Sequence, residues 1–443
     1  MPEAGCEAIP VPGGGLLGAL REKLAGENAR ELAALYAVHA AAVATPLAIV
    51  PYAARVLGPD GWGTYSIFHS LALYASFLVE YGFNLSATRE VARMRESRTE
   101  RARLLAGVIA AKLVLAALLI VAALAALQFV PMIGAHPWLM GGAMLFAFSH
   151  GMGLVWYFQG TAQVRRIAWA EIGCRLLAVL LTLLLVRNPS DDWLLLGIHG
   201  VSLLLVAAAG TVLAVRETGI GRLSLAGAAA ALKQGFSLFV FRGAASLYTV
   251  ANGFVLSMFA PAVAVGFFAG GERISKGFAG LLNPLVQAWY ARVNHAAGDL
   301  REFQRLRRRG MLVMTGAGVA IGVLLFAAAP LLVRILLGPG FEPAVTVLRI
   351  FALLPPVTAL STTLGLHGLL PLGRDRAFNA VVAAASVLNL GLAALVAGRW
   401  KETGMAAAVV STEVFVAVSF FVYLWRAGFN PVMRTSSRTG ASE

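Results

Sequence analysis

Long runs of apolar residues limit what this chain can fold into more than any other feature of the sequence. Residues 113–127, for example, read LVLAALLIVAALAAL. A helix of about 20 apolar residues crosses roughly 30 Å of membrane hydrocarbon. Of the 443 residues, 59% are hydrophobic and only 13% are charged, whereas soluble domains have about 25% charged residues. The sequence therefore predicts an all-α polytopic membrane protein.

Twelve apolar segments are predicted to span the membrane. They cover residues 32–54, 63–84, 103–129, 137–159, 165–187, 192–215, 233–259, 262–290, 310–337, 344–370, 376–397 and 403–426. The third, eighth and ninth segments are longer than a span needs, which predicts tilt or extension beyond the bilayer. The ninth is a candidate for a break near AAAPLLVRILLGPGFEP.

The positions of basic residues predict the orientation of these segments. The loop after the second segment is rich in arginine, and so is the loop after the eighth: Arg89, Arg93, Arg95, Arg98, Arg101 and Arg103, then Arg292, Arg301, Arg305, Arg307, Arg308 and Arg309. The opposite loops hold few basic residues: Arg55, Arg187, Arg334, Arg399 and Lys401. Because cytoplasmic loops collect Lys and Arg, both termini are predicted to be cytoplasmic, and the net charge of +14 reflects topology rather than nucleic-acid binding.

The predicted spans divide into two halves. We expect a cytoplasmic tail (1–31), an N-terminal lobe of six helices (32–216), a cytoplasmic linker (217–232), a C-terminal lobe of six helices (233–427) and a second cytoplasmic tail (428–443). Because each half has an even number of spans, both halves have the same orientation in the membrane, as in transporters built from parallel repeats. Pro59 and Pro261 follow the first and seventh segments in similar contexts, which favours a repeat.

Polar and charged residues follow helical periodicity in three of the segments. One polar face in 233–259 consists of Arg242, Ser246, Thr249, Gly253 and Ser257, and one in 63–84 of Ser66, His69, Ser76, Glu80 and Asn84. Their spacings of three and four place each set on one side of a helix. The stretch FFAGGERISKGFAGLL (267–282) carries Glu272, Arg273 and Lys276 within apolar sequence. A charge at the centre of a membrane helix costs about 2.5–3.5 kcal/mol on insertion scales. The presence of these three charged residues therefore requires a structural or functional explanation.

Structural explanations exist for several of these residues. Glu272 and Lys276 are four apart and can neutralise one another, and Glu171 and Arg175 have the spacing of a structural ion pair. Lys112 is expected to snorkel from the cytoplasmic end of its helix. The glycines in 262–290 are typical of helix packing.

Arg242 and Arg273 have no carboxylate three or four residues away on their own helices. Arginine stays charged, so each must face another helix, water or an anion. Together with Lys276, these two arginines predict an anionic cargo.

Several stretches resemble the Wzx-type flippases of polysaccharide biosynthesis, in the multidrug/oligosaccharidyl-lipid/polysaccharide exporter superfamily. They are PYAARVLGPDGWGTYSIF, EYGFNLSATREVARMR, SLYTVANGFVLSMFAPAVAVGFFAGGERI, LLNPLVQAWYARV and FEPAVTVLRIFALLPPVTALSTTLGLHGLLPLGRDRAFN. The likeness covers about residues 32–425. It implies two six-helix lobes around a central cationic cavity, with an undecaprenyl-pyrophosphate-linked oligosaccharide as cargo in the bacterial cytoplasmic membrane. It also implies a polysaccharide polymerase or chain-length machinery as a candidate partner.

On this interpretation the cavity residues and the coupling residues are predicted as follows. The candidates for binding the pyrophosphate and sugars are Arg242, Arg273, Lys276, Asn252, Ser246, Thr249 and His69. The candidates for coupling to an ion are Glu80 and Glu272. No Cys/His cluster indicates a metal site, and no cofactor is expected.

Three alternatives stay open on the sequence alone. A cation-coupled multidrug exporter would need carboxylates facing a cationic drug, and a peptidoglycan-precursor flippase typically has two further helices. A membrane glycosyltransferase is favoured only by Asp191 and Asp192, which we interpret as acids at a helix start.

Overall fold

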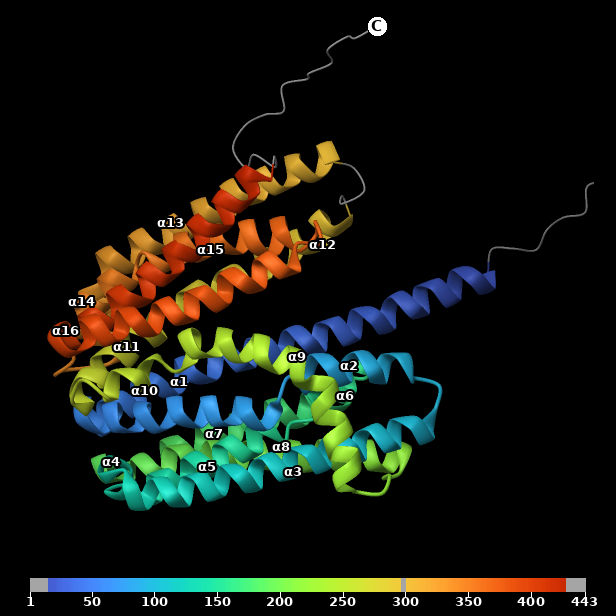
Figure 1. The fold of residues 1–443 in the computed structure, drawn as a ribbon, viewed down its shortest axis with the longest axis horizontal. Helices are drawn as coiled ribbons and strands as arrows, with labels where there is room; N and C mark the ends of the chain where they lie inside the picture. Colours follow the sequence, from blue (N-terminus) through green and yellow to red (C-terminus); the bar gives the residue numbers. More distant parts are fainter. Residues whose placement is uncertain (1–14, 296–299, 428–443) are drawn as a thin grey trace, which may run out of the picture.

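The computed structural model describes residues 15–295 and 300–427, which form helices joined by short turns, with no strand among them (Figure 1). The first half contains α1 (Gly15–Glu80), α2 (Phe83–Arg93), α3 (Arg98–Phe129), α4 (Pro131–Gly134), α5 (Pro137–Gly151), α6 (Val155–Gly160), α7 (Arg165–Leu185), η1 (Pro189–Asp191) and α8 (Asp192–Thr218). The second half contains α9 (Leu225–Val250), α10 (Asn252–Ser257), α11 (Ala262–Ala279), η2 (Gly280–Leu282), α12 (Asn283–His295), α13 (Leu300–Leu336), α14 (Ala344–Phe351), α15 (Leu354–Leu364), η4 (Gly365–Leu369) and α16 (Asp375–Arg426).

Many of these helices are suited to a membrane. Within the described residues, seven helical stretches are long and apolar enough to cross one: Arg98–Phe129, Pro137–Gly160, Arg165–Leu185, Pro189–Thr218, Glu302–Leu336, Ala344–Leu369 and Asp375–Arg426. The predicted all-α membrane class is thereby confirmed. The count of twelve spans stays a prediction.

Two of the helices are bent where the sequence predicts a loop between two spans. The bend in α1 is at Gly58, whose φ of 67° lies in the left-handed region. Glycine adopts this conformation without a Cβ penalty, and Pro59 can begin the next helical stretch because its missing N–H is not needed there. The bend in α16 is at Lys401, with a φ of 43°.

Other predicted boundaries differ from the structure. The stretch 233–259, predicted as one helix, is divided at Ala251 into α9 and α10, and 262–290 is divided by η2 into α11 and α12. Conversely, α13 continues through Pro330 to Leu336, so the candidate break in the ninth segment is absent there. The chain turns only afterwards, near Gly338, which has a φ of 93°.

The second part of α1 crosses α11 at very short range. A Cβ on Gly63 would clash with the backbone carbonyl of Ala262, and a Cβ on Gly266 would clash with that of Pro59. Small residues allow the backbones of membrane helices to approach this closely. The crossing fixes the position of α11, with its three charged residues, against α1.

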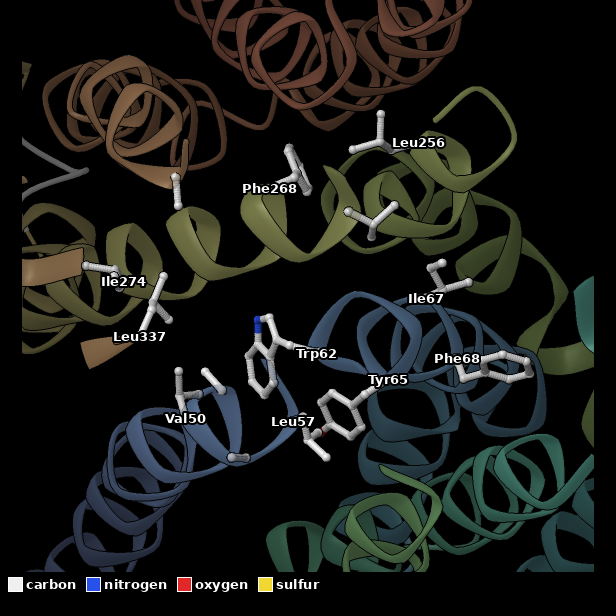
Figure 2. Packing of buried hydrophobic residues seen from close by; sticks show 14 of the residues in the cluster. Val50, Leu57, Trp62, Tyr65, Ile67, Phe68, Leu256, Phe268, Ile274 and Leu337 are labelled. Atoms are coloured by element: carbon white, nitrogen blue, oxygen red, sulfur yellow. The ribbon is translucent and has the colours of Figure 1, made fainter. Parts of the chain in front are cut away.

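The helices gather in sequence order. In Figure 1, α2–α8 lie on one side of the molecule and α12–α16 on the other, with α10 and α11 between them; α9 begins beside α3 and runs toward the middle. The side chains at the α1–α11 crossing form part of a large apolar cluster that includes Leu57, Trp62, Phe268, Ile274 and Leu337 (Figure 2).

Candidate functional site

A cavity of about 360 Å³ lies beside the α1–α11 crossing. The helices α1 and α11 supply most of its lining, and α8, α9 and α13 complete it. Its polar and charged lining residues are Thr45, Tyr65, Ser66, His69, Ser70, His199, Thr249, Glu272, Arg273 and Lys276. A concave site with a few convergent polar groups on an otherwise apolar wall is typical of ligand binding.

Arg273 is held in this cavity by aromatic rings from α1. Its guanidinium carbon lies 4.3 Å from the ring centre of Trp62 and 5.2 Å from that of Tyr65. The side chain of Trp62 is fully buried and reaches from α1 toward α11, with Tyr65 beside it (Figure 2). An arginine over the face of a tryptophan is attracted by the negative face of the ring. The rings therefore position the cation without cancelling its charge.

Arg273 also contacts His69. Its Nη2 lies 3.3 Å from Nδ1 of that histidine. Among the described residues, no carboxylate forms an ion pair with Arg273. Arg273 therefore lies at the wall of the cavity without an ion-pair partner among the described residues. A cation in this position can bind an anion without first breaking an ion pair.

Lys276, the second predicted cation, is paired. Its Nζ lies 2.9 Å from Oε1 of Glu272 and 3.1 Å from the backbone carbonyl of Thr249. The structure thus contains the i,i+4 pair that the sequence left as an open alternative. The side chain of Lys276 is 56% exposed, and exposed pairs contribute little stability, so the pair is easily rearranged.

The cavity brings together five of the nine predicted site residues: His69, Thr249, Glu272, Arg273 and Lys276. Asn252 is buried at the start of α10, and Glu80 is buried at the end of α1; neither lines the cavity. The side chains of Arg242 and Ser246 lie outside the described residues. The binding and coupling roles of all nine stay predictions.

Lys112 is placed differently from the expectation. Its side chain is 1% exposed, its Nζ donates to the carbonyl oxygen of Gly153 at 3.0 Å, and it lies 6.0 Å from the ring centre of Trp156. The prediction that Lys112 snorkels was therefore wrong. The carbonyl of Gly153 is available because α5 ends at Gly151 and α6 begins only at Val155, and carbonyls at helix ends have no partner within the helix.

Sequence reasoning missed Trp62, Tyr65 and His199, and also the small polar lining residues Thr45, Ser66 and Ser70. A signal for the first two was present, because Trp62, Tyr65 and His69 are spaced three and four apart and so share one helix face. Their rings stack in series, with centres 5.3 Å and 5.5 Å apart. His199 gave no such signal, since it is a single histidine within the apolar sequence of α8.

Comparison with known proteins adds a family and a fold. A family model described as "Polysaccharide biosynthesis protein" matches residues 30–293. The Escherichia coli (strain K12) protein named "Putative O-antigen transporter" is 28% identical over 387 residues, covering 86% of this chain and 92% of that protein.

Two solved structures share the fold at low sequence identity. The lipid II flippase MurJ in an inward closed conformation has a TM-score of 0.71 at 13% identity, covering 89% of this chain and 87% of that one. A multidrug resistance MATE family transporter of the MOP superfamily, in an inward-facing conformation, has a TM-score of 0.70 at 13% identity, covering 88% and 96%. The activities named for these two proteins differ, so the fold alone does not identify a cargo.

Proposed function

Because the chain belongs to the polysaccharide biosynthesis protein family, we propose that it is a flippase that moves an oligosaccharide linked to a polyprenyl pyrophosphate across the bacterial cytoplasmic membrane. The O-antigen transporter name of its Escherichia coli relative supports this cargo class. The expected topology is two six-helix lobes with both termini in the cytoplasm. A polysaccharide polymerase is a candidate partner.

The observation that carries the proposal is the unneutralised charge of Arg273 in the cavity. At an effective dielectric of about 20, a cation 4 Å from a phosphate charge gains roughly 4 kcal/mol before desolvation. Arginine is also suited to phosphate by geometry, because its fork of N–H donors binds two oxygens at once. A diphosphate at this wall would lie between Arg273 and the rearranging pair of Lys276 and Glu272.

The proposed mechanism is alternating access, in which no covalent bond is made or broken. The pyrophosphate and the sugars enter the cavity, while the polyprenyl tail stays in the lipid. The close crossing of α1 and α11 lies beside the cavity. For release, the two halves rock and this crossing separates.

The electrostatics of the cavity separate this proposal from a multidrug exporter. A cationic drug would require a carboxylate free to receive it, and Glu272, the one acid among the described lining residues, is paired with Lys276. The cargo of a lipid II flippase also carries a pyrophosphate, so the electrostatics of the cavity do not distinguish that alternative. The two cargoes differ in the glycan, and the experiment must therefore vary the glycan.

Translocation in proteoliposomes tests the proposed function. One leaflet is loaded with a labelled undecaprenyl-pyrophosphate oligosaccharide, with lipid II and a cationic dye as competing cargoes. We expect the wild type to move the oligosaccharide lipid and Arg273→Ala to slow it at least tenfold. Arg349→Ala is the matched control, because Arg349 also lies over an aromatic ring, that of Phe326 at 5.4 Å, but outside the cavity. Transport of the dye alone would overturn the proposal.

A further inference from the structure

The contact between Arg273 and His69 determines where the proton of the histidine is. The guanidinium has only N–H donors and no acceptor. Since Nη2 of Arg273 lies 3.3 Å from Nδ1 of His69, Nδ1 must be the acceptor of this hydrogen bond. A histidine that accepts at Nδ1 is neutral and carries its proton on Nε2.

The ring of His69 is held in this orientation by its neighbours. It stacks on Tyr65 with centres 5.5 Å apart and meets the ring of Phe146 from α5 edge-on at 5.4 Å. In this orientation, a proton can be added at Nδ1 only when Arg273 moves away from that atom. The two cations would then face each other across the same short gap.

Charged and titratable groups from three other helices surround His69. Arg273 and Lys276 on α11, His199 on α8 and His150 on α5 all act on it electrostatically, and each is a cation or can become one. The nearby acid Glu272 is paired with Lys276, and Tyr65 on the same helix is neutral unless it loses its own proton. An anion bound between Arg273 and His69 would bring a negative charge among these groups.

We propose that His69 takes up a proton at Nδ1 when an anionic headgroup binds to Arg273, so that the headgroup and the proton enter the cavity together. The proposal rests on the proposed function and adds a coupling residue to it. The incoming phosphate oxygens replace Nδ1 as the acceptor for Arg273 and accept from the new N–H of His69. Each binding event then favours the other by the same factor, because such linkage is reciprocal.

The proposal departs from the sequence-based choice of Glu80 and Glu272 as coupling residues. Glu80 does not line the cavity, and Glu272 is engaged by Lys276. His69 lines the cavity, contacts the cation that receives the cargo, and titrates near neutral pH when unperturbed.

Binding of farnesyl pyrophosphate to the purified full chain, measured over about pH 5.5 to 8, tests the coupling. The informative variant is His69→Asn, whose amide oxygen can still accept from Arg273 but whose side chain takes up no proton. The diphosphate has its own titration, which is common to every variant. We expect the wild-type affinity to rise more steeply as pH falls than that of His69→Asn, by up to tenfold per pH unit for one proton.

His136→Asn is the matched control, because His136 lies at the exposed start of α5, outside the cavity. It is expected to keep the wild-type pH slope. Proton uptake is counted independently, by calorimetry in two buffers of different ionisation enthalpy. Equal slopes and equal proton uptake in the wild type and His69→Asn would overturn the coupling alone. Absence of farnesyl pyrophosphate binding at every pH would overturn the proposed anion site as well.

Discussion

The guanidinium of Arg273 lies 4.3 Å from the ring centre of Trp62, across the interface between α11 and α1. The two residues are far apart in sequence, and each comes from a helix that the close crossing at Gly63 and Gly266 holds in place. An arginine within a membrane segment usually pairs with a carboxylate or with backbone carbonyls. Here an aromatic ring takes that position, which leaves the charge available to a ligand.

Replacing Trp62 should therefore weaken anion binding, and it should also lower stability because the side chain is fully buried. Trp62→Phe keeps an aromatic face under Arg273, whereas Trp62→Leu removes it. A partly desolvated cation–π contact contributes about 1–2 kcal/mol, so we expect Trp62→Leu to lower headgroup affinity roughly 5- to 30-fold, and Trp62→Phe to lower it less. Equilibrium binding of a short polyprenyl pyrophosphate measures this. Equal losses in the two variants, at matched thermal stability, would contradict the positioning role of the ring.

Adding a methyl group at the crossing should separate α1 from α11. Gly266→Ala places a Cβ against the carbonyl of Pro59, and overpacking of this kind costs about 1–3 kcal/mol. We expect a lower unfolding temperature and slower cargo transport. Gly173→Ala on α7 is the matched control, since nothing lies within 4 Å of its added Cβ. A Gly266→Ala variant as stable as this control would mean that the crossing is not tight.

Patterns local to one helix were the most predictable from the sequence. The pair of Glu171 and Arg175 forms at 2.7 Å, as its i,i+4 spacing predicted. The break after α9 was also signalled, because Asn252–Gly253 is a turn dipeptide, but the apolar residues on both sides favoured one continuous helix. The burial of the Lys112 side chain was not predictable from the sequence. It depends on the carbonyl of Gly153, which becomes available only where α5 ends.

Contacts between distant helices could not be read from periodicity. The sequence identifies Arg273 as a cation without a local partner, but it does not show that His69 and Trp62 are its neighbours. That arrangement depends on the angle and distance at which α1 crosses α11. The resemblance to a family predicted a central cationic cavity, and the structure supplied the contacts within it.

Neutralising Glu272 should make the cavity more cationic. Glu272→Gln removes the carboxylate 2.9 Å from Lys276, leaving a second charge for an anionic headgroup. We expect headgroup affinity to rise several-fold and to become more sensitive to salt, because screened attraction now contributes more. Titration at low and high ionic strength measures the change.

Glu171→Gln provides the comparison for Glu272→Gln. It removes the carboxylate from an equally spaced pair, with Arg175 on α7, but it does so outside the cavity. The affinity of the Glu171→Gln variant for the headgroup should stay at the wild-type value. An unchanged affinity in Glu272→Gln would show that Lys276 does not reach the bound anion.

An ion-pair cluster at the end of α8 should stabilise the first half of the chain. Glu217 accepts from Arg101 of α3 at 2.6 Å and from Arg166 of α7 at 3.0 Å. The side chain of Arg101 is only 8% exposed, so Glu217→Ala leaves a largely buried charge without its partner. Breaking a buried pair in this way costs about 3–5 kcal/mol, and we expect somewhat less here because Arg166 is exposed.

Thermal unfolding in detergent measures the loss in Glu217→Ala, and Glu90→Ala is the matched comparison. Glu90 pairs with Arg93 at 3.1 Å, but the arginine is 63% exposed, so this substitution should change the unfolding temperature little. Because the cluster joins α3, α7 and α8 outside the cavity, headgroup affinity should be retained in Glu217→Ala at temperatures below unfolding. A similar small shift in both variants would mean that Arg101 finds water or another acceptor when Glu217 is removed.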